Sequence, residues 1–334
     1  QITQERLVER LNQVRVFRAV LKAQPNVIDA IYPHHVLPSI CGRGVILPNL
    51  RVLELLIQKG VTEHNMQNLV IPLLSPELKR IKVKTGNGAF HMHGMYRCIA
   101  RRSLALKELS LSSTSAGLAA AHFLTIDTLS LQELRDVCDV AAIGSMSGLK
   151  SLVITKQTTS PLVRWTTVNE RSSQMSKNSF PDLVNLEITA SNINALQGMV
   201  MTLPIVKPSV CTLLILRSGK DWAKVFELLE ARIAPINLNK LELWFGSETS
   251  RHGYDYTGWR GTGLAPGHLQ CLSPFRNLRH FHFSASNIDG FQISARDQDI
   301  ESLAMSCPRL TALILEGCPT QTTSKMTLMA LEYL

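Results

Sequence analysis

The side chains best suited to bind a metal lie in two short stretches of the chain. They are His91, His93 and Cys98 in one, and His34, His35 and Cys41 in the other. Imidazole and thiolate are the usual zinc ligands, and zinc motifs combine them at paired spacings such as CxxC or HExxH. Neither stretch has such spacing, and each lacks a fourth ligand. We therefore predict loop histidines without a metal, no cofactor, and a metal-dependent enzyme only as an alternative.

Two further motifs could support chemistry. His280 and His282 alternate along one expected strand and share a face. Because imidazole titrates near neutral pH, we interpret them as surface groups that could make a pH-sensitive contact. The glycine-rich stretch Gly258–Gly263 does not lead from a strand into a helix and lacks the Lys-Ser/Thr pair of a phosphate-binding loop. No GxSxG motif occurs, so we assign no catalytic residue and expect a protein that is not an enzyme.

An internal sequence repeat predicts the strands and helices that would position these side chains. An apolar-x-x-apolar-x-apolar pattern recurs ten times, beginning at Leu50, Leu78, Leu106, Ile126, Leu149, Leu183, Val210, Leu238, Leu278 and Leu310. A weaker copy begins at Val14. The mean interval is about 29 residues, at the long end of the range for leucine-rich repeats. Since alternate strand residues face opposite sides, the last two apolar positions of each copy should enter a core shared by stacked strands.

Between the expected strands the apolar spacing becomes helical. Segments 66–73, 134–141 and 300–307 place apolar residues at i, i+3, i+4 and i+7, and Pro308 ends the last of them. Asp221 is suited to cap another helix. The sequence therefore predicts an α/β fold: a curved leucine-rich-repeat solenoid with a parallel inner sheet and outer helices.

The repeat also suggests how the chain is divided. We expect residues 1–45 to form an N-terminal helical or capping segment with a degenerate first repeat. Residues 46–334 would form the array, which stops in mid-pattern at the C-terminus. Two intervals are too long for a bare repeat and predict inserts at 157–180 and 244–275.

Composition limits the possible partners and compartments. The net charge is +9, but basic residues are spread along the chain and are dense only at Lys79–Lys84 and Arg101–Arg102. We expect a solvated basic surface without a specific nucleic-acid partner; an acidic protein partner fits the charge equally well. No apolar run reaches the roughly 18 residues of a membrane span, so no membrane association is expected. The 7 cysteines lack a CxxC pair and suggest free thiols in the cytoplasm and/or nucleus.

Several segments resemble F-box proteins. The stretch Ser306–Pro319 resembles their cysteine-containing repeat, CPxLxxLxLxxC. Leu47–Leu55 and Leu74–Val83 are similar to the region after the F-box in many fungal members, and Gln13–Val20 to the element that follows the F-box.

This resemblance implies the substrate-binding region of an F-box subunit in a cullin-type ubiquitin ligase, whose repeats select a protein substrate. No segment here resembles the F-box itself, so adaptor and cullin subunits are expected only through an F-box outside this chain. A stand-alone repeat scaffold or inhibitor, unrelated to ubiquitin, is the alternative.

The predicted sheet indicates which side chains would bind a partner. Residues beside each strand's middle apolar position should project from the inner sheet. They include Arg80, Lys82, Glu108, Asn185, Glu187, Thr212, Leu214, Lys240, Glu242, His280 and His282. Their mixed charge suits a protein ligand.

The second predicted insert is another candidate binding region. It contains aromatic and arginine side chains, the types that dominate binding hot spots: Trp244, Tyr254, Tyr256, Trp259 and Arg260. The alternative is that these rings cover the edge of the array.

Overall fold

The computed structural model describes residues 4–21, 45–57, 70–85, 93–111, 125–131, 143–144, 146, 148–155, 180–217, 224–246, 263–285 and 291–317. The chain forms two compact units, Gln1–Leu149 and Lys150–Leu334.

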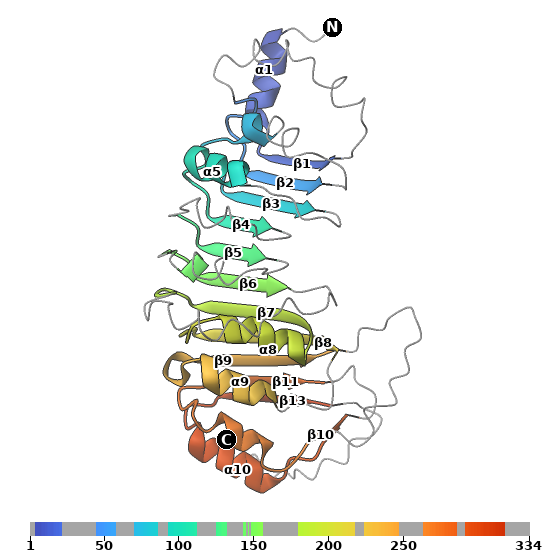
Figure 1. Cartoon of the computed structure of the whole chain (residues 1–334), viewed down its shortest axis with the longest axis vertical. Coiled ribbons are helices and arrows are strands. Elements are labelled where there is room, and N and C mark those ends of the chain that lie inside the picture. The colour runs from blue at the N-terminus through green and yellow to red at the C-terminus, as the bar shows by residue number, and fades with distance from the viewer. Residues whose placement is uncertain are drawn as a thin grey trace, which may run out of the picture. The chain divides into compact units, whose positions relative to one another are not determined.

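The described part of the first unit is built on parallel strands that follow one another in chain order (Figure 1). They are β1 (Val16–Leu21), β2 (Val52–Ile57), β3 (Arg80–Thr85), β4 (Glu108–Leu111) and β5 (Thr128–Leu131). The helix α1 (Gln4–Gln13) precedes β1, and the 3-10 turn η1 (Ile71–Leu73) and the helix α5 (His93–Arg102) lie between later strands. Of the predicted helix 66–73, only 70–73 is described, and it holds the η1 turn with Pro72 near its start.

Two apolar rows run across the first ladder. One contains Phe17, Leu53, Ile81, Leu109 and Leu129, and the other Ala19, Leu55, Val83, Leu111 and Leu131. From β2 to β5 every member is buried, whereas the two members on β1 are half-buried. Each strand adds two apolar side chains that only a neighbouring strand can cover. The predicted in-register packing of the leucine pattern is confirmed here.

The second unit repeats this arrangement. Its parallel ladder is β6 (Ser151–Thr155), β7 (Asn185–Asn192), β8 (Val210–Arg217), β9 (Lys240–Phe245), β11 (His280–Ser284) and β13 (Ala312–Glu316). A separate parallel pair joins β10 (Gly263–Leu264) to β12 (Gln292–Ile293). The main core row contains Leu152, Leu186, Cys211, Leu241, Phe281 and Leu313.

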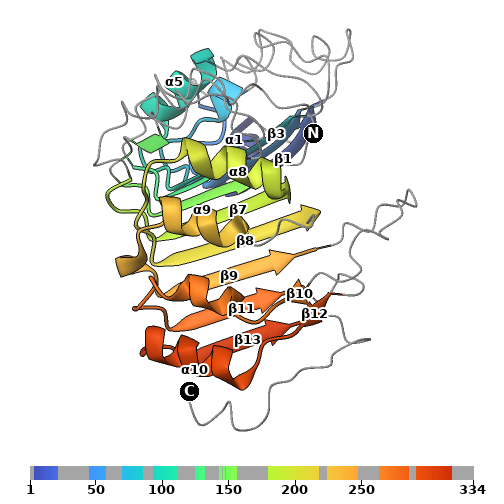
Figure 2. The same ribbon diagram turned by 60° about the horizontal axis from the view of Figure 1, so that its bottom comes forward.

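Helices cover one face of this second ladder (Figure 2). They are α8 (Ile193–Thr202), α9 (Lys224–Arg232) and α10 (Asp297–Ser306), with the 3-10 turns η5 (Pro235–Asn237) and η7 (His268–Leu272). The helix α10 matches the predicted segment 300–307 closely. Asn192 caps α8, since its side chain accepts a hydrogen bond from the Ala195 backbone N–H at 2.8 Å. The predicted helix 134–141 and the Asp221 cap lie outside the described residues.

The β8 strand corrects one detail of the sequence prediction. The pattern beginning at Val210 pairs Leu213 and Ile215 with the core positions of other strands. In the structure Cys211 and Leu213 occupy those rows, two residues earlier. Because the shift is two residues, each β8 side chain stays on its expected face of the sheet. Leu214, however, pairs with Trp244 and not with Glu242. The error arises because β8 is apolar at nearly every position, so hydrophobicity alone does not define its register.

A buried carboxylate fixes the start of α10. Asp299 Oδ2 accepts a hydrogen bond from the Arg296 backbone N–H at 2.7 Å, and its Oδ1 accepts one from Gly267 N–H, also at 2.7 Å. Gly267 adopts a left-handed conformation with φ of 86°, which glycine tolerates without strain. One side chain therefore joins the first turn of α10 to the turn before η7.

The cysteine after α10 is also part of the core. Cys307 is buried, and its Sγ lies 3.5 Å from the Phe275 carbonyl oxygen and 3.6 Å from that of Leu272. Its thiol therefore contacts the backbone of the preceding repeat. Within the described residues, no helix is both long and apolar enough to cross a membrane.

Candidate protein-binding face

The first strand face is the side of the first ladder whose side chains alternate with the core rows. Arg80 and Glu108 are paired in register across β3 and β4. Arg80 Nη2 donates to Glu108 Oε1 at 3.0 Å, and Arg80 Nε donates to Glu108 Oε2. The ion pair is therefore bidentate. Arg18 on β1 and Glu54 on β2 form an ion pair through a single hydrogen bond, from Arg18 Nε to Glu54 Oε2 at 2.6 Å.

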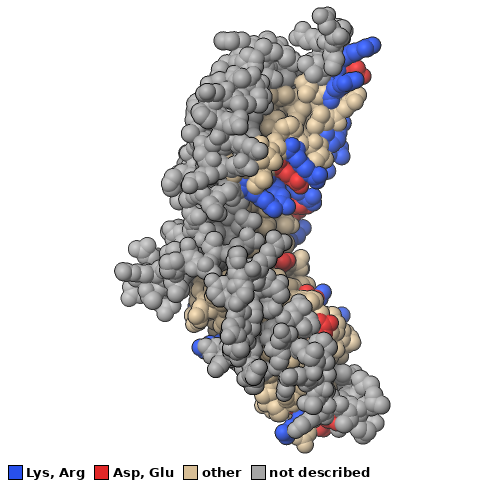
Figure 3. All heavy atoms as spheres, turned by 90° about the vertical axis from the view of Figure 1, so that its right-hand side faces the viewer, with Lys and Arg blue, Asp and Glu red and all other residues tan. Residues whose placement is uncertain are grey.

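Charge and apolar surface occur together on this face. The hydrogen bond and charge of Glu108 raise the pKa of Arg80 above its already high ordinary value. Lys82 occupies the register position between Glu54 and Ser110. Val16, Val20 and Leu56, on alternate positions of β1 and β2, are exposed. In Figure 3, red acidic atoms lie among the blue basic atoms of this unit. The structure thus brings Arg80, Lys82 and Glu108 together on one face, and their role in binding a partner stays a prediction.

The second strand face is the corresponding side of the second ladder. Most of the predicted binding residues lie there in two adjacent rows. One row contains Asn185, Val210, Lys240, His280 and Ala312, and the other Glu187, Thr212, Glu242, His282 and Ile314. Leu214 lies in the next row with Thr189, Trp244, Ser284 and Glu316.

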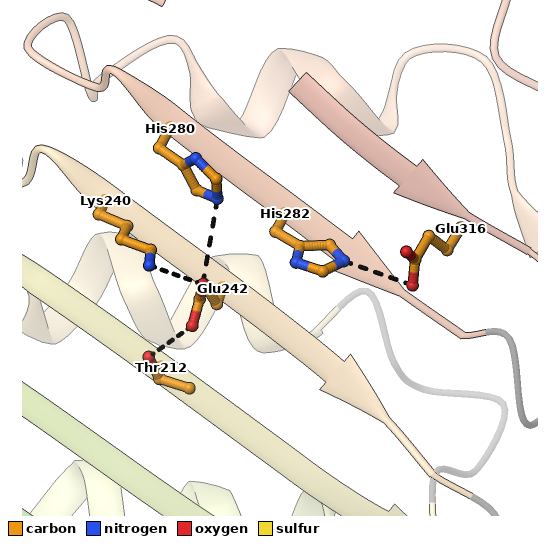
Figure 4. A network of polar contacts seen from close by, with 6 residues as sticks. All are labelled: Thr212, Lys240, Glu242, His280, His282 and Glu316. Carbon is orange, nitrogen blue, oxygen red and sulfur yellow. Dashed lines mark hydrogen bonds and ion pairs between the residues drawn. The ribbon is translucent and has the colours of Figure 1, made fainter. Parts of the chain in front are cut away.

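Glu242 is the centre of a polar network on this face (Figure 4). Lys240 Nζ lies 2.9 Å from Glu242 Oε1, and Thr212 Oγ1 donates to Oε2 at 3.2 Å. His280 Nε2 lies 4.0 Å from the same Oε1. Burial alone would raise the pKa of Glu242. The hydrogen bond and positive charge of Lys240, together with the hydrogen bond from the Thr212 hydroxyl, outweigh burial and lower that pKa. The carboxylate is therefore held ionised.

His282 is buried, which differs from the sequence interpretation of both histidines as surface groups. The Trp244 ring packs against it with centroids 4.4 Å apart and planes at 61°. On its other side, His282 Nε2 lies 3.4 Å from Glu316 Oε2. A hydrogen bond from Ser284 lowers the pKa of Glu316, and the His282 contact lowers it further.

His280 is half-buried beside it, with ring centroids 6.4 Å apart. Burial lowers the pKa of His280, and the charge of Lys240 lowers it further, against the opposing effect of Glu242. The neutral imidazole is therefore favoured near neutral pH. That the pair makes a pH-sensitive contact stays a prediction.

The structure also shows what sequence reasoning missed. Glu316 was not predicted, although it lies two residues beyond Ile314 on the same face. Trp244, assigned to the second insert, lies within β9 and packs on His282. Of the other insert residues, Tyr254, Tyr256, Trp259 and Arg260 lie outside the described residues, as does insert 157–180 apart from Phe180.

The two histidine–cysteine stretches lie mostly outside the described residues. His34, His35, Cys41 and His91 lie outside the described residues. His93 begins α5, and Cys98 is half-buried on that helix.

One strand per repeat, parallel in-register pairing and helices on a single face define an α/β solenoid of the leucine-rich-repeat type. No family model matches this chain, and no curated protein matches it. Among solved structures, a leucine-rich-repeat protein of Leptospira interrogans aligns at 12% identity and a TM-score of 0.28. That alignment covers 100% of this chain and 91% of that one. The fold assignment rests on this chain's own ladders.

Proposed function

We propose that this chain is a protein-recognition module that binds a partner through its strand faces. The observation that carries the proposal is the division of the second ladder between its two faces. Helices cover one face, while rows of charged, polar and apolar side chains line the other. Recognition surfaces of repeat proteins are extended sheets of this kind, whose side chains can vary without changing the core.

The chemistry of the faces supports a protein ligand. The Arg80–Glu108 and Lys240–Glu242 pairs place both signs of charge on them, whereas a phosphate backbone would favour a continuous basic track. Exposed Leu56 and Ile314 add apolar contact area within that polar setting. Apolar side chains surrounded by polar ones are typical of protein–protein interfaces.

A more specific role follows from the resemblance to F-box proteins. We propose that the partner is a protein substrate and that the chain is the substrate-binding region of a cullin-type ubiquitin ligase in the cytoplasm and/or nucleus. The sequence around Cys307 supports this, since it resembles the cysteine-containing repeat of those proteins. Adaptor and cullin subunits would join through an F-box outside this chain. A scaffold or inhibitor without ubiquitin chemistry is the competing role.

Affinity purification with matched variants tests recognition first. The double variant Asn185→Arg/Glu187→Arg changes two exposed residues of the second strand face. The control Ile236→Arg/Met305→Arg changes two exposed side chains on η5 and α10. We expect a protein that co-purifies with wild type and control but is lost from the face variant. Equal recovery by all three would contradict binding through this face.

A second purification tests the ubiquitin role. With the full-length protein as bait, adaptor and cullin subunits should co-purify together with the substrate. Recovery of the partner without any adaptor or cullin subunit would support a scaffold or inhibitor.

A further inference from the structure

Three potential metal ligands meet on the second strand face. Glu242 on β9 and His280 and His282 on β11 each offer one ligand atom, and these atoms lie within 4.8 Å of one another (Figure 4). Glu242 and His282 are register partners, and His280 lies two residues before His282 on the same strand. Neighbouring strands of a packed ladder hold the three side chains, which gives a more rigid platform than a loop.

Both imidazoles have a buried nitrogen without a hydrogen-bond partner. Among the described residues, the buried side-chain N and O atoms in this condition are Ser103 Oγ, Arg232 Nε, His280 Nε2 and His282 Nε2. His282 is 8% exposed, so solvent has little access to it. Its 3.4 Å contact with Glu316 falls within ion-pair range but lacks the alignment of a hydrogen bond.

Such atoms require an explanation, because buried polar groups in proteins are almost always paired. Two of the four belong to neighbouring histidines whose ring centroids lie 6.4 Å apart, near an ionised carboxylate. A bound cation would pair with His280 Nε2 and the carboxylate; because His282 Nε2 is directed at Glu316, His282 would contribute its other ring nitrogen.

We propose that Glu242, His280 and His282 form a binding site for a divalent zinc-type cation. Two imidazoles and one carboxylate are a common ligand set for zinc, and they leave a fourth position for water or a donor from a partner. Ligand atoms around tetrahedral zinc lie about 3.4 Å apart, given bonds of about 2.0–2.2 Å. The present separations, up to 4.8 Å, would have to shorten by up to about 1.4 Å, and rotation of the three side chains would have to supply that change.

The surrounding contacts are compatible with this site. Thr212 hydrogen-bonds Glu242 Oε2 and orients the carboxylate, as outer-shell partners of metal ligands do. Lys240 is the competitor, since its Nζ lies 2.9 Å from Oε1. Its side chain is 41% exposed and can turn its charge to solvent when the cation binds.

Zinc titration of the metal-stripped chain tests the site. We would follow zinc chloride binding by calorimetry and by tryptophan fluorescence, because Trp244 packs on His282. The variants Glu242→Gln and His280→Gln should each weaken binding at least about tenfold, since even outer-shell changes cost about 10–100-fold. Glu187→Gln, an exposed carboxylate in the same row, is the matched control and should bind like wild type.

The outcomes decide the proposal. His282→Gln alters a buried residue, so its fold is checked by circular dichroism, and the other two variants remain decisive if it unfolds. Zinc uptake that is equal in wild type and all variants would assign the metal to other histidines or cysteines and overturn the site. Absence of zinc binding to the wild type would overturn it as well. The titration uses no partner, so its failure leaves protein recognition untouched.

Discussion

The buried carboxylate at the start of α10 gives the sharpest stability prediction. Asp299 accepts two backbone hydrogen bonds at 2.7 Å, from Arg296 and from Gly267. A hydrogen bond to a charged group contributes about 1.5–3 kcal/mol, and an abandoned buried N–H adds its own desolvation cost. Asp299→Asn keeps one acceptor and should lower the free energy of unfolding by about 2 kcal/mol. Asp299→Ala removes both and should lower it by about 4 kcal/mol.

Two measurements together check this prediction. Urea denaturation followed by circular dichroism gives the global loss, and hydrogen exchange reports α10 and the turn at Gly267 directly. Local exchange is needed because repeat arrays do not always unfold in one step. Glu301→Gln, half-buried on the same helix, should change stability by no more than about 0.5 kcal/mol. If Asp299→Asn behaved like that control and α10 exchanged at the wild-type rate, the proposed link between helix and turn would be wrong.

The remaining predictions concern the core and the first strand face. Phe281→Ala, at a fully buried position, should cost about 3–5 kcal/mol by urea denaturation, and a loss below about 1 kcal/mol would contradict that packing. Burial raises the pKa of Cys211 from 9.0 to about 12, so the native thiol should resist iodoacetamide at pH 8 while exposed Cys271 reacts. Because the folded pKa is the higher one, that thiol's contribution to stability should be complete below pH 9.0 and be lost as the pH rises towards 12. A flat stability profile across this range in a comparison of wild type with Cys211→Ala would argue against it. Glu108→Gln breaks an exposed ion pair with Arg80 and should cost less than about 1 kcal/mol, an effect that disappears in high salt.

The ladder was predictable because its physical cause is local and repeated. Strands with Leu or Ile at alternate positions can bury them only by stacking, so Leu53, Ile81 and Leu109 indicate both the strand and its partner rows. The β8 strand was mispredicted by two residues because its apolar run offers two equivalent registers. The register of β8 is set by its pairing with β7 and β9, which the sequence of β8 alone does not specify.

The candidate site was only partly predictable. Alternation placed Glu242, His280 and His282 on one face, but their mutual distances depend on the register between β9 and β11. The burial of His282 depends on Trp244 packing over it, which no periodicity encodes. Glu316 lies at the end of β13, two residues beyond Ile314, so alternation around the middle apolar position does not point to it.

We propose that the second strand face, and not the helical side of the second ladder, recognises a protein. Site-specific photo-crosslinking in cells tests it most directly, with a benzophenone amino acid introduced at Ile314 on the second strand face or at Met305 on α10. Both side chains are exposed, at 37% and 78% respectively. We expect a discrete crosslinked protein from position 314 and none from position 305. Crosslinking from position 305 alone, or none from either position, would contradict it.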